Sequence, residues 1–264
     1  MLVGLATDPV GLARQLTIAL RVVLDDASSP DAVVDAGRRQ QFVIRRLAAN
    51  PDWQAPMLAA MPDNDLRTIA RNDLEAINAP GNAALAKPVP PLDTVPAWRI
   101  REPRPVDELL GYYREAHAAT GIEWFYLAAI NLVETRMGRI VGLSPSGAVG
   151  PMQFLPTTWA ACCQGDPADD HDAIRGAATY LVRRGGPADM TRAILGYNPN
   201  DAYLAMITRY AENLRTHPAL YSGYHAWQVF VTTTSGPLRL PPGYEQPEPA
   251  LAIDYIAAHP DDRA

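Results

Sequence analysis

Glu134 is the residue whose setting points most directly to chemistry. It stands near the end of an almost wholly apolar segment, residues 123–137, which predicts a central buried helix ending just before Gly138. Burial disfavours the charged carboxylate, and the negative end of the helix dipole disfavours it further, so we expect a raised pKa. A carboxylic acid that keeps its proton near neutral pH can protonate the leaving oxygen of a glycosidic bond. A buried ion pair with Arg136 or Arg139 is the structural alternative.

Two later segments carry side chains that could bind a sugar. Residues 144–159 read Ser-Pro-Ser-Gly-Ala-Val-Gly-Pro-Met-Gln-Phe-Leu-Pro-Thr-Thr-Trp, and residues 193–198 read Ala-Ile-Leu-Gly-Tyr-Asn. The candidate groups in them are Ser144, Met152, Gln153, Tyr197 and Asn198. An amide side chain both donates and accepts hydrogen bonds, as sugar recognition requires. Taken singly, each residue also has an ordinary structural interpretation, in the core for methionine and tyrosine and in a turn for serine and glycine.

Together with Glu-Thr-Arg-Met-Gly-Arg at 134–139, and in this order, these segments resemble the lytic transglycosylases of bacterial cell walls. That family has a lysozyme-like fold and carries a Glu-Ser dipeptide, a Gly-Leu-Met-Gln segment and an Ala-Tyr-Asn segment. The Glu-Thr-x-x-Gly-Arg form is most similar to that of its B-type membrane-bound members. The resemblance covers about residues 106–215. Thr135, Pro151 and Gly196 stand where the family usually has Ser, Leu and Ala, and they keep the small or apolar character.

The resemblance implies cleavage of the β-1,4 bond between N-acetylmuramic acid and N-acetylglucosamine in peptidoglycan. Glu134 would be the single catalytic group. It would act first as the acid and then as the base on the 6-hydroxyl group of muramic acid, which gives a 1,6-anhydro product without water. The resemblance implies no cofactor and no metal.

The resemblance also implies substrate-binding roles for five residues. Ser144 would hydrogen-bond the N-acetyl group of the sugar or the catalytic carboxyl group. Met152 and Gln153 would line the cleft. Tyr197 and Asn198 would stand beside the catalytic glutamate, where the tyrosine hydroxyl group can orient the carboxyl group.

A second catalytic carboxylate is not evident, although hydrolysing glycosidases usually use two. The acidic residues between Asp166 and Asp172 come closest, but Asp172 is predicted to cap a helix and the others to lie in a solvated loop. A calcium loop is a weaker alternative. With one carboxyl group the substrate must supply its own nucleophile, which favours a lytic transglycosylase. A lysozyme-type hydrolase of the same bond and a non-catalytic glycan-binding or scaffold module remain the alternatives.

The elements that would position these groups are mainly α-helical. Helix signals recur over residues 1–78, a proline-rich connector follows at 79–105, and a lysozyme-like catalytic domain is expected at 106–216. Residues 217–264 form a C-terminal extension, expected to pack on the catalytic domain. Within it, residues 227–234 predict a short β element, and residues 250–258 predict a last helix. Trp98 and Ile100 are expected to fix the connector to the body of the protein.

Composition and charge limit the classes of partner that the protein is expected to bind. The formal net charge is −6 with no long basic tract, which disfavours nucleic acid, and no apolar run is long enough to span a membrane. Peptidoglycan strands are the expected partner, and the N-terminal helices could dock other cell-wall enzymes. Residues 2–24 indicate an amphipathic helix and not a signal peptide. Either the protein stays inside the cell or an export signal has been removed; the resemblance favours an extracytoplasmic protein.

The two cysteines, Cys162 and Cys163, are adjacent. Neighbouring cysteines rarely form a disulfide because the eight-membered ring strains the peptide bond. We therefore expect two small packed side chains. A zinc site completed by His171 is a weaker alternative.

Overall fold

The computed structural model describes residues 4–79 and 91–264, so part of the expected connector, residues 80–90, lies outside the described residues. The predicted fold class is confirmed: the protein is mainly α-helical with a few short strands, consistent with a lysozyme-like fold. None of the helices in the described ranges combines the length and the apolarity that crossing a bilayer requires. The chain forms two compact packing units.

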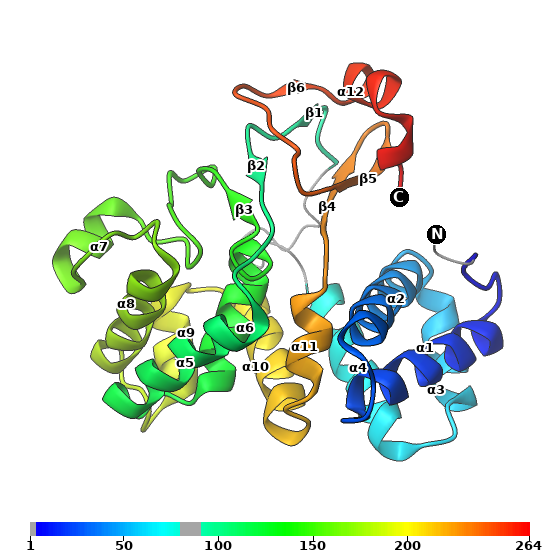
Figure 1. Ribbon diagram of the computed structural model, residues 1–264, viewed down its shortest axis with the longest axis horizontal. Coiled ribbons are helices and arrows are strands. Elements are labelled where there is room, and N and C mark those ends of the chain that lie inside the picture. The colour runs from blue at the N-terminus through cyan, green and yellow to red at the C-terminus, as the bar shows by residue number, and fades with distance from the viewer. Residues whose placement is uncertain (1–3, 80–90) are drawn as a thin grey trace. The chain divides into compact units, whose positions relative to one another are not determined.

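The first unit combines the N-terminal helices with residues 200–227. Its helices are α1 (Pro9–Leu24), α2 (Pro30–Ala48), α3 (Gln54–Ala60), α4 (Asn64–Asn78), α10 (Asp201–Thr216) and α11 (Leu220–His225) (Figure 1). The side-chain oxygens of Asp8, Ser29, Asp63 and Asn200 each accept a backbone N–H group from the first turn of the following helix. These caps satisfy donors that a helix start leaves unpaired, which explains why the helices begin there.

A buried polar cluster connects four helices of the first unit. Asp73 on α4 accepts hydrogen bonds from Gln40 on α2 (2.7 Å), from Asn213 on α10 (3.1 Å) and from Tyr224 on α11. Burial raises the pKa of the Asp73 carboxyl group to about 7, although the three hydrogen bonds act in the opposite direction. The cluster therefore places a titratable acid in the middle of a helical core.

These packing units divide the chain differently from the domain boundaries expected above. The expected catalytic domain included α10, but α10 packs against α4 in the first unit. Tyr210, Tyr224 and Trp227 make edge-to-face ring contacts in that unit, and all three are buried. The aromatic side chains at 224 and 227 are thus part of a core and do not form a sugar-binding surface.

The helices of the second unit are α5 (Val106–Thr120), α6 (Trp124–Thr135), α7 (Pro156–Cys162), α8 (Asp170–Arg183) and α9 (Met190–Tyr197). Helix α8 packs against each of the other four. Its buried face carries Ala173, Ala177, Ala178 and Leu181. The three alanines are small and let the neighbouring helices approach closely. The helix predicted over residues 123–137 is present as α6, with ends that differ by one or two residues.

Three two-stranded antiparallel ribbons complete the second unit. Strand β4 (Val229–Thr233) pairs with β5 (Gly236–Leu240), β1 (Thr94–Val95) with β6 (Ala250–Leu251), and β2 (Arg99–Ile100) with β3 (Ile140–Val141). The β element predicted at 227–234 is therefore confirmed. The predicted last helix is α12 (Ala252–Ala258).

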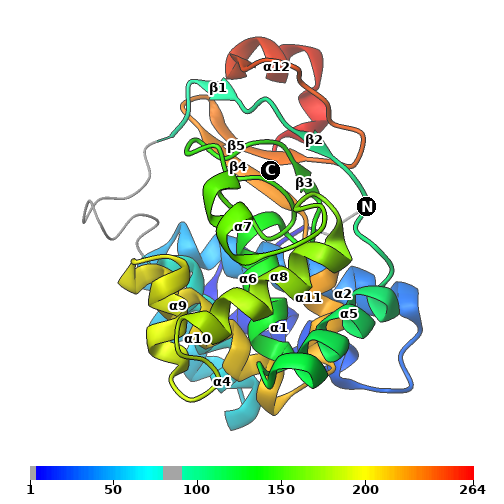
Figure 2. The same cartoon turned by 90° about the vertical axis from the view of Figure 1, so that its left-hand side faces the viewer.

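The strands β1, β4, β5 and β6 lie together with α12 in both views of the molecule (Figure 1, Figure 2). Their buried side chains form one cluster that includes Ile100, with Trp98 and Ile140 packed against it. Trp98 and Ile100 therefore fix the described part of the connector to the second unit, as expected. Since β2 of the connector pairs with β3, this contact lies only a few residues after Glu134 in the chain.

Candidate active site

Helix α6 places Glu134 at its last position but one. The helix is apolar on every side, as predicted, and its residues from Leu127 to Leu132 are fully buried. It packs against α5 and α8. Glu134 itself is only partly buried, so its carboxyl group stands where an apolar helix reaches solvent.

The turn after α6 has an unusual backbone. Arg136, Met137 and Gly138 are all left-handed, with φ angles of 55°, 63° and 78°. This conformation costs a residue with a side chain roughly 1–2 kcal/mol, and only glycine adopts it freely. The other non-glycine residue with a positive φ among those described is Gln153, at 50°. Strained backbone thus occurs at two of the three motifs, and strain of this kind clusters at functional sites.

Thr135 connects the end of α6 to the second motif. Its hydroxyl group donates a hydrogen bond to the Pro151 carbonyl oxygen (2.6 Å) and accepts one from the Gly138 backbone nitrogen (3.1 Å). The side chain has no exposed surface. The residue next to Glu134 is therefore tied to the loop that carries Met152 and Gln153.

That loop is a tight hairpin. Val149 and Phe154 exchange two backbone hydrogen bonds of 2.9 Å, and Gln153 donates both its backbone N–H and its amide Nε2 to the Gly150 carbonyl oxygen. Gly150 has a φ of 75°, and a Cβ atom added there would lie 1.7 Å from the Pro167 carbonyl oxygen. Two backbone segments therefore touch at Gly150, and only glycine fits.

Met152 and Gln153 differ in exposure. The Met152 side chain is fully buried, so in this structure it offers no surface to a sugar, and the residue's link to the site is its backbone carbonyl group. That carbonyl oxygen accepts a hydrogen bond from the Tyr197 hydroxyl group at 2.7 Å. Gln153 is half-buried. Of the two residues expected to line a cleft, Gln153 is the one with exposed side-chain surface.

Tyr197 stands close enough to Glu134 for the two to interact electrostatically. Burial raises the pKa of the Tyr197 hydroxyl group well above its ordinary value, and the nearby Glu134 charge raises it further. The hydroxyl proton is donated to Met152, while the oxygen keeps acceptor capacity. The Tyr197 ring is held by edge-to-face contacts with Phe154 and Tyr180, each at 5.6 Å between centroids.

Two hydrogen bonds connect the segments around Glu134. Thr135, the residue after Glu134, donates to the Pro151 carbonyl oxygen, and Tyr197 donates to the Met152 carbonyl oxygen. Three motifs that are separate in the sequence thus meet in one network. That Tyr197 stands beside a catalytic glutamate stays a prediction.

Ser144 and Asn198 occupy supporting positions. The Ser144 side-chain oxygen accepts backbone N–H groups from Ser146 (3.2 Å) and Ala148 (3.0 Å), which is the turn role foreseen as its structural alternative. Its hydroxyl proton can still be donated to a ligand. Asn198 ends α9 directly after Tyr197 and is half-buried. Substrate binding by these two residues stays a prediction.

Arginines fix the strained turn from the outside. Arg101 donates its Nε–H to the Gly138 carbonyl oxygen (2.8 Å) and forms an ion pair of 2.7 Å with the buried carboxylate of Asp170. Arg139 pairs with Glu102 at 2.8 Å. Sequence reasoning missed the Arg101–Asp170 pair, because the two residues are 69 positions apart and neither belongs to a motif.

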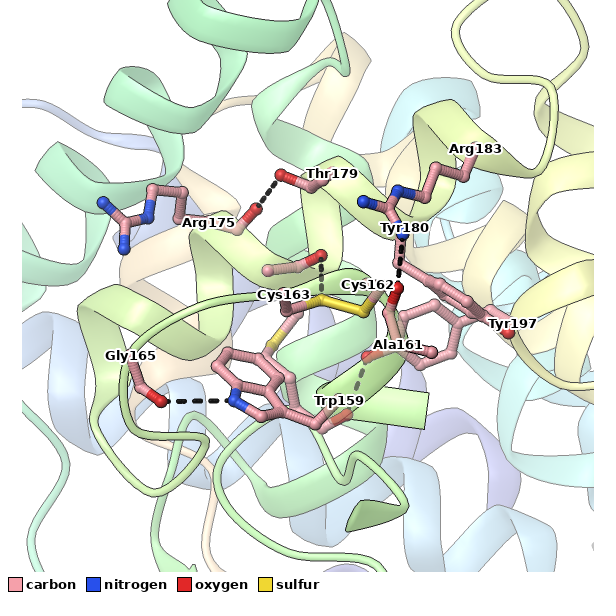
Figure 3. The surroundings of a disulfide bond; sticks show 12 residues. Trp159, Ala161, Cys162, Cys163, Gly165, Arg175, Thr179, Tyr180, Arg183 and Tyr197 are labelled. Carbon is pink, nitrogen blue, oxygen red and sulfur yellow. Dashed lines mark hydrogen bonds between the residues drawn. A yellow bond between two sulfur atoms is a disulfide. The ribbon is translucent and has the colours of Figure 1, made fainter. Parts of the chain in front are cut away.

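The expectation for the cysteines was wrong. Cys162 and Cys163 are joined by a disulfide between adjacent residues, at the end of α7, and the described chain has no free cysteine (Figure 3). The Cys163 sulfur atom lies 3.6 Å from the Gly176 carbonyl oxygen of α8, and Arg183 donates to the Ala161 carbonyl oxygen at 2.8 Å. Both cysteine sulfurs are used in this bond, which removes the zinc alternative.

The acidic run has a different arrangement from the expected one. Asp169, and not Asp172, is the N-cap residue of α8, since its side chain accepts the Asp172 backbone N–H at 3.0 Å. Asp169, His171 and Asp172 lie near enough to one another to offer three ligand atoms to a metal ion. His171 also contacts Glu115 at 3.0 Å, and Asp172 contacts Arg175 at 3.0 Å. These ion pairs give the cluster a structural role.

Comparison with known proteins gives one partial relative. A membrane-bound lytic murein transglycosylase F from Thiobacillus denitrificans is 28% identical to this chain over 120 residues. The match covers 42% of this chain and 25% of the relative, so the chain spans about a quarter of the relative's length. No family model and no solved structure matches the chain.

This similarity supports a lytic transglycosylase-like family, in agreement with the three motifs. The relative is named as an F-type enzyme, whereas the Glu-Thr-x-x-Gly-Arg form resembles the B-type members. The subfamily therefore stays a prediction.

Proposed function

We propose that this protein is a peptidoglycan lytic transglycosylase that cleaves the β-1,4 bond between N-acetylmuramic acid and N-acetylglucosamine. The observation that carries the proposal is the pair of hydrogen bonds that joins the end of α6, with the partly buried Glu134 and the strained turn, through Pro151 and Met152 to Tyr197. The partial similarity to a lytic murein transglycosylase supports the substrate class.

In the proposed reaction Glu134 acts twice. Its carboxyl group donates a proton to the glycosidic oxygen as the bond from that oxygen to C1 of muramic acid breaks. The resulting carboxylate then takes the proton of the 6-hydroxyl group of the same sugar, whose oxygen bonds to C1. The product is a 1,6-anhydro ring, no water is consumed, and Glu134 regains its proton. One carboxyl group is therefore sufficient, and no cofactor is needed.

The other candidate residues support this chemistry by binding. Gln153 has exposed side-chain surface on a rigid hairpin, and its amide group can bind a sugar. The Tyr197 oxygen can accept a hydrogen bond from the protonated Glu134 carboxyl group, which would orient it. Ser144 and Asn198 are also proposed to bind the substrate. Met152 contributes through its carbonyl oxygen, which accepts the hydrogen bond from Tyr197.

An extracytoplasmic location follows from the proposed substrate, since peptidoglycan lies outside the cytoplasm. The Cys162–Cys163 disulfide supports it independently, because disulfides persist mainly in oxidising compartments. We further propose that the N-terminal helices dock other cell-wall enzymes.

Two alternative functions differ from the proposed one in the products that they predict. A lysozyme-type hydrolase of the same bond would leave reducing ends, which are heavier than anhydro ends by one water. A non-catalytic glycan-binding or scaffold module would bind the wall without releasing fragments.

The experiment is a turbidity assay on purified peptidoglycan with wild type, Glu134→Gln and Glu123→Gln. Glu123 stands at the other end of α6 and is exposed, so it serves as the matched control. We expect Glu134→Gln to lose roughly 10²-fold or more in rate, because its amide cannot transfer the proton. The control should clear the wall like wild type. Equal activity of wild type and Glu134→Gln would show that another group is the acid.

A further inference from the structure

We propose that Thr135 is the positioning residue that sets the Glu134 carboxyl group relative to Tyr197, through the bond from its hydroxyl group to the Pro151 carbonyl oxygen. The inference rests on the proposed function and assigns a role to a residue beside the catalytic group. Thr135 does not touch the substrate, since it has no exposed surface.

The direction of the Thr135 hydroxyl group is the first argument. In helices threonine commonly turns its hydroxyl group back to a carbonyl group of the preceding turn. Here the shorter contact crosses to the Pro151 carbonyl oxygen, 16 residues further along the chain, at 2.6 Å, whereas the Asn131 Oδ1 atom one turn back lies at 3.4 Å. A hydroxyl group has one proton and two lone pairs, so it can also accept the Gly138 backbone N–H at 3.1 Å. The Thr135 hydroxyl group thus acts both as a donor and as an acceptor to residues around Glu134.

The second argument is that the next carbonyl group, that of Met152, is held by Tyr197. Pro151 and Met152 are consecutive, and their carbonyl oxygens are held by Thr135 and by Tyr197 respectively. One side of this dipeptide is therefore tied to the residue after Glu134, and the other side to the tyrosine that Glu134 acts on. In this proposal, the two hydrogen bonds and the peptide unit between Pro151 and Met152 set the position of the Glu134 carboxyl group relative to Tyr197.

The third argument is that the anchor on the loop side is held by contacts of its own. Gly150 lies in backbone contact with the Pro167 carbonyl oxygen, and the Val149–Phe154 pair closes the hairpin. A bond to a rigid loop transmits position, whereas a bond to a mobile one would not. Displacing a catalytic group by about 1 Å can cost roughly 10²-fold in rate.

The chain offers a matched set of variants. Thr135→Val removes the hydroxyl group at nearly constant volume, and Thr135→Ser keeps the hydroxyl group and removes only the methyl group. Thr233→Val is the control, because Thr233 is also buried and also donates to a backbone carbonyl group, that of Gly236, at 2.7 Å. It lies in the β4–β5 ribbon, outside the contacts around Glu134.

The experiment measures kcat and KM on purified glycan strands, binding of the strands in a Glu134→Gln background, and thermal melting. We expect Thr135→Val to lower kcat by roughly 10- to 100-fold with KM and glycan binding almost unchanged. Thr135→Ser should restore most of kcat. Thr233→Val should keep wild-type kcat although it loses a hydrogen bond of similar length that is partly buried.

Three results would overturn the inference. Wild-type kcat in Thr135→Val would show that the bond does not position the acid. Equal losses in Thr135→Ser and Thr135→Val would assign the effect to the methyl group. If kcat, glycan binding and the melting temperature all fall together in Thr135→Val, the role of Thr135 is merely structural. If Thr135→Val does not fold, Thr135→Ala takes its place with the same expectations. An inactive wild type would instead overturn the proposed function itself, which separates the two failures.

Discussion

At the scale of single residues, the setting of Glu134 depends on groups that no local pattern predicts. Its position at the end of an apolar helix could be foreseen from residues 123–137. The Thr135 hydrogen bond and the Arg101–Asp170 ion pair could not, because they join segments that only the folded chain brings together. The left-handed backbone of Arg136 and Met137 was equally hidden, since neither is a residue type that favours it.

Two glycines of the second motif allow a direct test of the hairpin. Both Gly147 and Gly150 have left-handed backbone, with φ of 79° and 75°, but a Cβ atom on Gly147 would meet nothing within 4 Å. Gly147→Ala should therefore cost only the backbone penalty of about 1 kcal/mol. Gly150→Ala must also separate two backbone segments and should cost at least about twice as much, with a loss of glycan cleavage. Chemical denaturation of both variants would check this, and equal costs would contradict the backbone contact at Pro167.

At the scale of elements, helix starts were the most predictable features. Asp8 and Ser29 precede prolines at first-turn positions, and the structure has helices beginning at both sites. The N-cap of α8 was misplaced by three residues because four aspartates compete for it in the sequence, and only the folded turn selects Asp169. The cysteine pair was misjudged because the general rarity of bonds between neighbouring cysteines says nothing about this particular turn.

The disulfide at the end of α7 gives a chemical prediction. Protein unfolded without reductant should not react with iodoacetamide, because the described chain has no free cysteine. After reduction, both cysteines should be alkylated. Intact-mass spectrometry distinguishes the two states, and alkylation before reduction would contradict the bond.

At the scale of the whole molecule, the two packing units group α10 with the N-terminal helices. The expected domain boundaries stay predictions. The packing of α10 could not be foreseen, because α10 follows α9 after a short break and carries an ordinary amphipathic pattern. Only its packing against α4, with Asn213 hydrogen-bonded to Asp73, assigns it to the first unit.

The buried Asp73 gives that unit a pH-dependent stability. Its folded pKa of about 7 lies above the ordinary value of 3.8, so the folded state holds the proton more tightly than the unfolded chain does. Stability should therefore fall as pH rises from about 4 to 7, by at most roughly 4 kcal/mol, and then stay level.

Asp73→Asn removes this titration and should flatten the dependence of melting temperature on pH between about 5 and 8. The Gln40 side-chain oxygen is buried without a partner and can accept from the new amide group if the Gln40 amide turns over. Glu75→Gln removes an acid from the same helix together with an exposed ion pair to Arg209 (2.6 Å), and it is the control for the loss of one charge. A variant that is less stable than wild type only at high pH would contradict the raised pKa.

The central claim is that Glu134 breaks the glycosidic bond without water, and digestion in ¹⁸O-labelled water tests it most directly. Mass spectrometry of the soluble fragments should find anhydromuramic ends, one water lighter than reducing ends and free of ¹⁸O, with wild type and none with Glu134→Gln. Fragments with reducing ends that carry one ¹⁸O atom would identify a hydrolase and contradict the claim. The same anhydro fragments from Glu134→Gln would contradict the assignment of the acid.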